Sequence, residues 1–368
     1  MKVLFALDSL NRGGAETHAL DVVRNAGKFG IDAVFTAFGD GTLKEEFESA
    51  DIDFRYFNRR SAIDFSLIRR LRRVIKSEGV EIVHGFQPVE TIHLYLAALG
   101  TEAKCVQTHQ GFIAGSKNRR SARLISPLVD ANISVSKTLK NWLKTEIGLN
   151  TAGFDVVYNT VDENRILESE PIDRNEFGHD EFLGGMIANF VATPTKDQLT
   201  VCEALSQLFK NRLDCSFIFV GGIAHGAEEN YDKCVSICET ARISDRVIFA
   251  GPREDVPSVL RSLDFFVFSS RVEGLPVSVI EAMLAGVPLI VSDIEPLMEV
   301  TNEGECAKVF VTGDSASLSR QLESLLNDPA ERNRLSRAGQ DFARKTFGLE
   351  AHFENLIQVY ERIISRKS

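Results

Sequence analysis

Short apolar runs alternate with longer amphipathic segments along almost the whole chain, and this alternation restricts the possible folds more than any other feature. The run at 2–7 leads through a Gly-Gly loop into a helical pattern at 17–23, and further strand patterns at 33–37, 53–57 and 82–84 are separated by helical ones. Strands that alternate with helices in this way form a parallel sheet with helices on both faces. The sequence therefore predicts an α/β fold.

The length requires more than one domain. A chain of 368 residues is too long for one ordinary core, so two domains of about 150–200 residues are expected. We expect a first Rossmann-like domain at 1–165, a polar linker at 166–182 and a second Rossmann-like domain at 183–345. The segment 346–368 contains a helical pattern with one apolar face, and we expect this helix to pack against the body of the protein.

The composition narrows the class of protein. Apolar and charged fractions of 44% and 26% are typical of globular proteins and exclude a disordered or fibrous chain. No apolar run approaches the roughly 20 residues that a membrane-spanning helix needs. The six cysteines lack the spacing of zinc ligands, which favours free thiols in a reducing compartment. We therefore expect a cytoplasmic protein.

The most specific motif lies at 265–286, where an aromatic strand, a turn and a helix follow one another. The turn runs from Glu273 to Pro276, and the helix is expected at 276–285. A helix that begins after such a turn offers free backbone N–H groups and a partial positive charge to a phosphate. Glu273 and Glu281 flank this position, and their carboxylates can accept hydrogen bonds from sugar hydroxyls. The pattern is compatible with a nucleoside diphosphate sugar site, but a bare E-x7-E spacing is more often a surface helix residue and a loop charge.

The stretch SSRVEGLPVSVIEAMLAGVPLIVSD closely resembles the donor-site signature of the retaining GT-B glycosyltransferases of family four. The resemblance implies two facing Rossmann-like domains with the active site in the interdomain cleft, and a terminal helix that crosses back onto the first domain. It also implies that a hexose-type sugar is moved, with retention of configuration, from a nucleoside diphosphate sugar to an acceptor hydroxyl. The implied partners are the nucleotide sugar and a glycan or lipid-linked acceptor, and no nucleic acid.

The resemblance assigns roles to individual residues. Glu273 would hold the sugar hydroxyls and Glu281 the ribose, while Lys196 and the helix N-terminus would hold the departing diphosphate. An Arg that the family carries shortly before this Lys is absent, and Arg271 or Arg253 is expected to replace it. The residues expected to bind the donor are Gly13, Gly14, Lys196, Gly274, Leu275, Pro276, Val277 and Glu281.

His109 is the third expected catalytic residue, beside Glu273 and Lys196. It ends a strand pattern, and open α/β sheets place their ligands at strand ends. The family has a histidine near the reacting sugar carbon in a similar stretch, one position later, where this sequence has Gln110.

No metal or other cofactor is expected, because protein cations would neutralise the diphosphate. Asp51-Ile52-Asp53 has the D-x-D form of metal-dependent transferases. It stands at the entry to an ordinary strand, however, and we expect a solvated turn there.

Two basic clusters lie in the first half of the chain. The first is on the helical pattern at 65–78, and the second is at 117–123. They comprise Arg69, Arg70, Arg72, Arg73 and Lys76, followed by Lys117, Arg119, Arg120 and Arg123. Such residues form either solvated helix faces or a patch for anionic lipid headgroups or a lipid diphosphate. The second interpretation predicts peripheral contact with the inner face of the cell membrane. The family resemblance implies that the transfer belongs to the synthesis of envelope polysaccharide, lipopolysaccharide or glycolipid.

Two other functions are compatible with the motif. One is a nucleotide-sugar epimerase on the same fold, and the other is a sugar-nucleotide-binding protein that has lost catalysis. Turnover of the donor to free nucleotide distinguishes both from a transferase.

Overall fold

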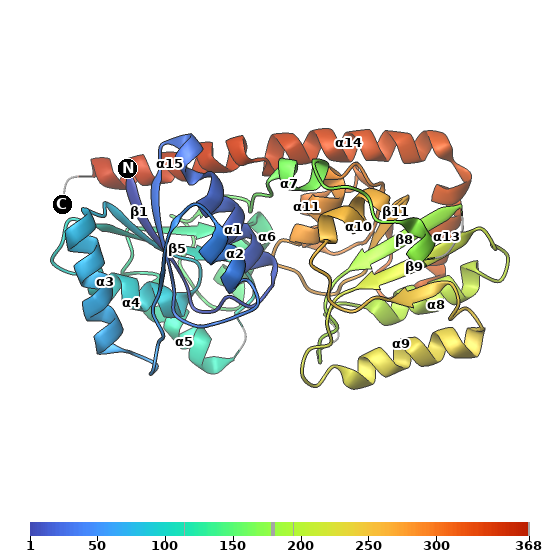
Figure 1. The fold of residues 1–368 in the computed structure, drawn as a ribbon, viewed down its shortest axis with the longest axis horizontal. Coiled ribbons are helices and arrows are strands. Elements are labelled where there is room, and N and C mark those ends of the chain that lie inside the picture. The colour runs from blue at the N-terminus through green and yellow to red at the C-terminus, as the bar shows by residue number, and fades with distance from the viewer. Residues whose placement is uncertain (114, 178–180, 194, 367–368) are drawn as a thin grey trace. The chain divides into compact units, whose positions relative to one another are not determined.

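The computed structural model describes residues 1–113, 115–177, 181–193 and 195–366 and confirms the α/β class. These residues form two compact units (Figure 1). The first comprises Met1–Val161 and Phe347–Ser368, and the second is Asp162–Thr346.

The first unit is built on a seven-stranded parallel sheet in the order β3-β2-β1-β4-β5-β6-β7. Its strands are β1 Lys2–Leu7, β2 Asp32–Ala37, β3 Asp53–Tyr56, β4 Ile82–Gly85, β5 Lys104–His109, β6 Ala131–Ser134 and β7 Asp155–Val156. The inner strand β1 pairs Val3 with Ala33 of β2 on one side and with Ile82 of β4 on the other. Because every strand runs the same way, the loops that follow them meet at one edge of the sheet.

Helices cover both faces of this sheet. They are α1 Gly14–Asn25, the 3₁₀ turn η1 Ala26–Phe29, α2 Lys44–Ser49, α3 Phe65–Glu78, α4 Pro88–Ala98, α5 Ser116–Ile125, α6 Lys137–Thr145 and α15 Leu349–Ser365. A capping residue marks each end of α3. The Asp64 side chain accepts hydrogen bonds from the Ser66 and Leu67 N–H groups, and Gly79 ends the helix in the left-handed conformation at φ 65°.

Helix α15 belongs to the core of the first unit although it lies almost 200 residues after that unit's sheet. Its inner face buries Phe353, Leu356, Val359, Tyr360 and Ile363 beside residues of β1 and α1. Burial of large apolar side chains of this kind contributes roughly 1.5–3 kcal/mol each. The helix is therefore part of the hydrophobic core of this unit.

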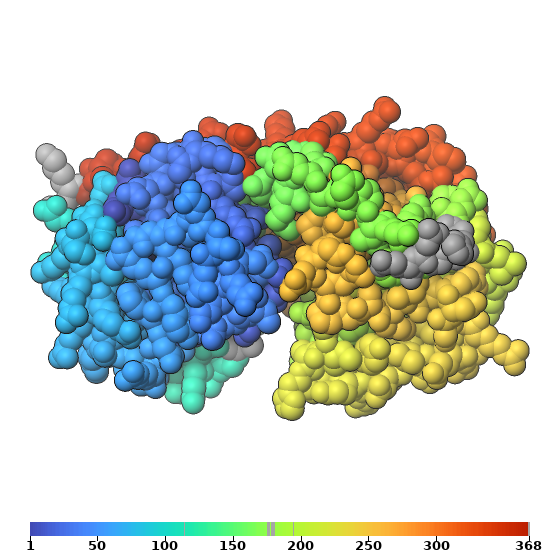
Figure 2. All heavy atoms as spheres, viewed as in Figure 1, coloured from blue at the N-terminus to red at the C-terminus, as the bar shows by residue number. Residues whose placement is uncertain are grey.

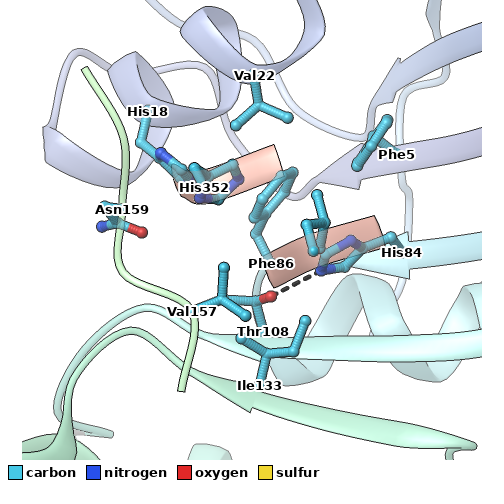
Figure 3. Close-up of a pocket in the computed structure, with 11 residues that line it drawn as sticks. Phe5, His18, Val22, His84, Phe86, Thr108, Ile133, Val157, Asn159 and His352 are labelled. Atoms are coloured by element: carbon cyan, nitrogen blue, oxygen red, sulfur yellow. Dashed lines mark hydrogen bonds between the residues drawn. The ribbon is translucent and has the colours of Figure 1, made fainter. Parts of the chain in front are cut away.

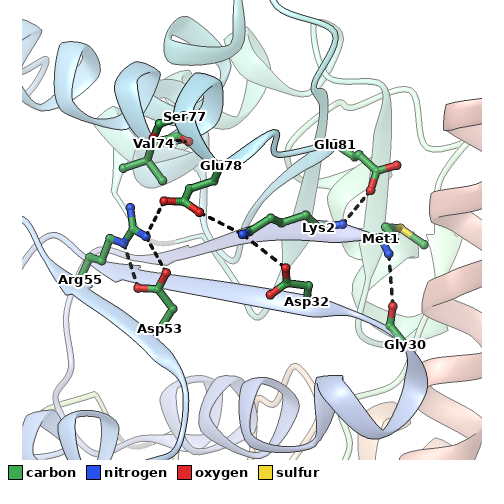
Figure 4. Close-up of polar contacts among 10 residues, drawn as sticks. All are labelled: Met1, Lys2, Gly30, Asp32, Asp53, Arg55, Val74, Ser77, Glu78 and Glu81. Atoms are coloured by element: carbon green, nitrogen blue, oxygen red, sulfur yellow. Dashed lines mark hydrogen bonds and ion pairs between the residues drawn. The ribbon is translucent and has the colours of Figure 1, made fainter.

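Ion pairs join the amino ends of β1, β2 and β3 to the end of α3 (Figure 4). Lys2 lies 3.0 Å from Glu78 and 3.3 Å from Asp32, and Arg55 lies 3.0 Å from Glu78. These donors lower the pKa of Glu78, with Lys2 the larger cause. Asp53, from the D-x-D stretch, accepts a hydrogen bond of 2.9 Å from Arg55 Nε. Its carboxylate is therefore paired with a cation of its own strand.

The second unit has a six-stranded parallel sheet in the order β10-β9-β8-β11-β12-β13. The strands are β8 Phe182–Ile187, β9 Cys215–Val220, β10 Val247–Phe249, β11 Phe265–Phe268, β12 Leu289–Ser292 and β13 Ala307–Phe310. The helices are α7 Glu163–Leu167, the 3₁₀ turn η2 Arg174–Phe177, α8 Gln198–Leu208, α9 Glu228–Ala241, α10 Val256–Ser262, α11 Val277–Leu284, α12 Glu295–Val300, α13 Ser315–Asn327 and α14 Pro329–Phe347. Helix α9, in yellow, lies on the outer surface of this unit (Figure 2). All six cysteines of the chain are buried free thiols.

The segment expected to be a linker belongs to the second unit as far as it is described; residues 178–180 lie outside the described part. An ion pair and a hydrogen bond from a backbone N–H attach this segment to the residues around α10. Arg174 lies 2.6 Å from Asp264, and the Ile172 N–H donates to Ser262 Oγ at 2.9 Å. The structure thus divides the chain at Val161 and Asp162, a few residues before the expected end of the first domain.

The position of Phe353 gives a prediction about stability. Phe353 is fully buried and stacks on Phe29 with ring centroids 4.3 Å apart, so Phe353→Ala should lower the free energy of unfolding by about 3–5 kcal/mol. Phe65, which is 71% exposed, provides the control, and Phe65→Ala should change it by less than about 0.5 kcal/mol. Chemical denaturation measures both variants, and equal effects would contradict the packing of α15.

Candidate active site

The predicted motif occupies the carboxyl end of the second sheet, between β11 and α11. The helix begins at Val277 with Pro276 as its N-cap, close to the expected start, and Gly286 follows it at φ 74°. The N-cap residue Pro276 makes no side-chain capping hydrogen bond. The Val279 N–H donates to the Pro276 carbonyl at 3.1 Å, so the N–H groups of Val277 and Ser278 are the ones without a carbonyl partner in the helix, and they can donate to an anion.

Glu273 is held at this turn by two donors. Its side chain is 8% exposed, Ser270 Oγ donates to its Oε1 at 2.7 Å, and Lys196 Nζ forms an ion pair with the same oxygen. Lys196 itself is fixed by a backbone bridge to Ser270 and lies 4.9 Å above the Phe268 ring. The structure thus brings together two of the three predicted catalytic residues.

Glu281 faces a cation that sequence reasoning missed. Arg165 of α7 places its Nη2 2.7 Å from Glu281 Oε1, and the Glu281 side chain is only 9% exposed. The two residues are 116 positions apart, and Arg165 stands in a polar stretch without a motif. No signal in a single sequence identifies this pair.

The two arginines expected to replace the missing family Arg are each paired with an aspartate. Arg271 lies 2.8 Å from Asp197, whose other oxygen accepts a hydrogen bond from the Thr200 N–H at the start of α8. Arg253 donates to Asp255 at 2.7 Å and lies 5.3 Å from the Phe177 ring. Both therefore stabilise neighbouring loops, and their role at the donor stays a prediction.

Gly13 and Gly14 lie in the first unit, at the carboxyl end of β1. Gly13 is the N-cap of α1, and a side chain there would place its Cβ 2.7 Å from Glu16 Oε2. A substitution would therefore displace the Glu16 carboxylate, whose pKa is raised by burial. Gly13 thus closely approaches a side chain, and donor binding by Gly13 and Gly14 stays a prediction.

His109 is part of the core of the first unit. It is 1% exposed, stacks on Phe154 with centroids 5.3 Å apart, and lies 3.2 Å from Asn132 Oδ1 through its Nε2. Burial lowers its pKa to about 4, so the ring is neutral near pH 7. The neighbouring Gln110 is also buried, and both polar atoms of its amide lack a hydrogen-bond partner among the described residues. Because its side chain is buried in the described structure, nothing here supports the predicted catalytic role of His109, which stays a prediction.

Three further histidines surround a closed cavity of ≈ 10 Å³ beneath α15 (Figure 3). The rings of His18 and His352 lie 5.0 Å apart, and His84 contacts Thr108 Oγ1 at 2.7 Å and the Tyr360 hydroxyl at 2.6 Å. Burial lowers the pKa of His84 to about 3 and that of His352 to about 4. The cavity is large enough for one water molecule at most.

No group of three or more His, Cys, Asp or Glu side chains arranged to hold a metal ion is found among the described residues. Within the same residues, no helix is both long and apolar enough to cross a bilayer.

Two family models match the chain in succession. The model described as Glycosyltransferase Family 4 matches residues 12–165, and the one described as Glycosyl transferases group 1 matches residues 172–342. Together they cover most of both units. The chain belongs to glycosyltransferase family 4. The family models give no support to the epimerase interpretation.

Two similar proteins have names that state an activity. The 2-deoxystreptamine glucosyltransferase of Streptomyces kanamyceticus is 28% identical over 233 residues, 61% of this chain and 58% of the relative. The UDP-Gal:alpha-D-GlcNAc-diphosphoundecaprenol alpha-1,3-galactosyltransferase of Escherichia coli is 27% identical over 63% of this chain and 62% of the relative. The chain thus matches about three fifths of the length of these proteins.

One solved structure matches this chain over almost its full length. Anabaena HepE in complex with UDP and glucose superposes with a TM-score of 0.84 at 19% identity, covering 98% of this chain and 99% of that one. The fold is therefore GT-B.

The buried histidines give a prediction about acid stability. Because the folded pKa of His109 is about 4, the unfolded chain binds a proton that the folded chain does not as the pH falls below about 6.5. Stability should therefore decrease between about pH 6.5 and pH 4, and His109→Gln should reduce the slope by about 1 kcal/mol per pH unit. Denaturation at several pH values measures it. An equal slope in the wild type and in His109→Gln would contradict the assignment.

Proposed function

We propose that this protein is a retaining glycosyltransferase that moves a hexose from a nucleoside diphosphate sugar to a hydroxyl of a glycan or lipid-linked acceptor. The observation that carries the proposal is the arrangement at the start of α11. There Lys196, Ser270 and Glu273 form one hydrogen-bonded cluster beside a helix N-terminus whose N-cap residue, Pro276, makes no side-chain capping hydrogen bond.

The cluster suits the departure of a diphosphate. As the bond between the sugar carbon and the phosphate oxygen breaks, negative charge grows on that oxygen. The Lys196 ammonium group and the first N–H groups of α11 stabilise this charge. The acceptor oxygen forms the new bond on the same face of the sugar, and its proton goes to the departing phosphate.

Glu273 supports the reaction in two ways. Its Oε1 holds Lys196, so the ammonium group is positioned before the donor arrives. A carboxylate is also a strong acceptor for sugar hydroxyls. Ser270 fixes the side chain by donating to the same oxygen at 2.7 Å.

The class of acceptor that we propose comes from the names of the two relatives. The Escherichia coli relative is named for transfer to a sugar on diphosphoundecaprenol, and the Streptomyces relative for a small aminocyclitol. The lipid-linked alternative also fits the basic surface of the first unit. Arg69, Arg72, Arg73 and Lys76 line a groove on α3, and Lys117 and Arg120 are exposed on α5.

Some basic side chains have structural roles. Arg72 donates to the Ala97 carbonyl at the end of α4 at 3.1 Å, and Arg123 donates to the Ile147 carbonyl at 2.7 Å. Arg70 and Arg119 likewise donate to backbone carbonyls, at 3.4 and 3.3 Å. The exposed cations are Arg69, Arg73, Lys76, Lys117 and Arg120, and each would contribute roughly 1 kcal/mol at an anionic membrane surface. We therefore propose peripheral contact with the inner face of the cell membrane.

A screen of nucleotide sugars tests the proposed function. With a matching donor and an acceptor, the protein should release free nucleoside diphosphate, and this should continue in EDTA because Lys196 and α11 neutralise the leaving group. A donor at 100 times its dissociation constant should also stabilise the fold by about 2.7 kcal/mol. Exchange between sugar isomers without an acceptor would instead identify an epimerase, and loss of activity in EDTA restored by Mn²⁺ would refute the metal-free mechanism.

Lys196→Ala should be among the most damaging single changes. Stabilisation of a developing oxyanion is worth about 3–4 kcal/mol, so kcat should fall by roughly 100- to 1,000-fold while KM changes less. Steady-state kinetics measures both parameters.

Lys233 provides the matched control, because it is an exposed lysine of the same unit paired with Glu229. Lys233→Ala should leave kcat unchanged. If Lys196→Ala costs less than tenfold while Arg271→Ala or Arg253→Ala costs far more, another cation stabilises the leaving group.

A further inference from the structure

We propose that Arg165 is a positioning residue for the nucleotide donor, which orients Glu281 to accept a hydrogen bond from the ribose. This inference rests on the proposed function, in which Glu281 contacts the ribose. It adds a residue from α7, outside the predicted motif, to the donor site.

The Arg165–Glu281 pair is a short ion pair in a largely buried position. Nη2 lies 2.7 Å from Oε1, with the arginine side chain 25% exposed and the glutamate side chain 9% exposed. A carboxylate this deeply buried needs a partner, because an uncompensated charge there costs several kcal/mol. Arg165 is therefore the group that permits a carboxylate at position 281.

Helix α7 is anchored in the second unit around Arg165. The Asp162 side chain caps the helix by accepting from the Asn164 N–H at 3.1 Å. Glu163 forms an ion pair with Arg344 of α14, and Arg261 of α10 donates to the Leu167 carbonyl at 2.7 Å. These contacts fix the backbone that carries Arg165, so its guanidinium has a defined position for holding Glu281.

The geometry leaves Glu281 with one oxygen committed and one available. Oε1 accepts from Arg165, and no hydrogen bond to Oε2 is found within the described ranges. A planar guanidinium directs its N–H groups along fixed lines, so it restricts the rotation of the carboxylate in a way that a lysine ammonium would not. Oε2 is then presented in one orientation, as an acceptor for a ribose hydroxyl.

The other cations near the motif have different partners. Lys196 pairs with Glu273, and Arg271 pairs with Asp197. Within the residues described by the structure, Arg165 is the only cation that forms an ion pair with Glu281. Removal of Arg165 therefore takes away the cation paired with Glu281 and leaves the Lys196–Glu273 and Arg271–Asp197 pairs in place.

The test compares ribose with deoxyribose. UDP, GDP and ADP, each with its 2′-deoxy form, are titrated into the wild-type protein by calorimetry, and the nucleotide bound most tightly is used for the variants. The wild type should prefer the ribonucleotide by about tenfold, the value of roughly one good hydrogen bond to a charged group. Arg165→Ala and Glu281→Ala should both remove this preference while affinity for the 2′-deoxy form changes less than threefold.

Two further variants sharpen the result. Arg165→Lys keeps the charge but loses the directed N–H groups, so it should keep less than half of the wild-type preference. The double variant Arg165→Ala with Glu281→Ala should bind no more weakly than Glu281→Ala alone, because the two residues act as one unit. In steady-state kinetics, Arg165→Ala should raise KM for the donor more than it lowers kcat.

Arg174 is the matched control, since it lies in the same segment and forms a comparable ion pair with Asp264 at 2.6 Å. Arg174→Ala should keep the tenfold preference. If Arg165→Ala keeps it too, or weakens ribose and deoxyribose forms equally, the positioning role is wrong. If the wild type shows no preference for ribose, or if Glu281→Ala keeps the preference, the proposed contact between Glu281 and the ribose is itself wrong.

Discussion

Two nearly buried carboxylates, Glu273 and Glu281, impose the main physical constraint on the second unit. Each requires a cation, because an isolated charge in such a position is costly. Lys196 reaches Glu273 from the loop after β8, and Arg165 reaches Glu281 from α7. The turn after β11 and helix α11 are therefore tied by charge to segments that lie 77 and 116 positions earlier in the chain.

This constraint explains why polar residues after the first unit fold as they do. The composition of 166–182 is typical of a linker, but its one arginine, Arg174, and the neighbouring Arg165 both find carboxylates, one just before β11 and one on α11. Arg165 pairs with Glu281 and Arg174 with Asp264. A segment that would be solvated in isolation thus becomes part of the domain that carries the motif.

Sequence reasoning reached the α/β class, the alternation of elements and the start of α11 because these depend on local patterns. It also identified Lys196 and Glu273, which lie in or near a recognisable motif and form an ion pair. It missed Arg165 because an ion pair across 116 positions leaves no local pattern. It also did not anticipate that Arg271 and Arg253 would be paired with aspartates, since pairing depends on the tertiary fold.

The place of α15 has a consequence for synthesis of the chain. The second unit is one continuous segment, Asp162–Thr346, whereas the first combines Met1–Val161 with Phe347–Ser368. Residues of α15 such as Phe353 and Tyr360 are fully buried beside β1. During translation the first unit therefore stays without part of its core until those last residues emerge from the ribosome. The unit that is translated first is the second to be completed, and its exposed apolar face must be protected from aggregation for that interval.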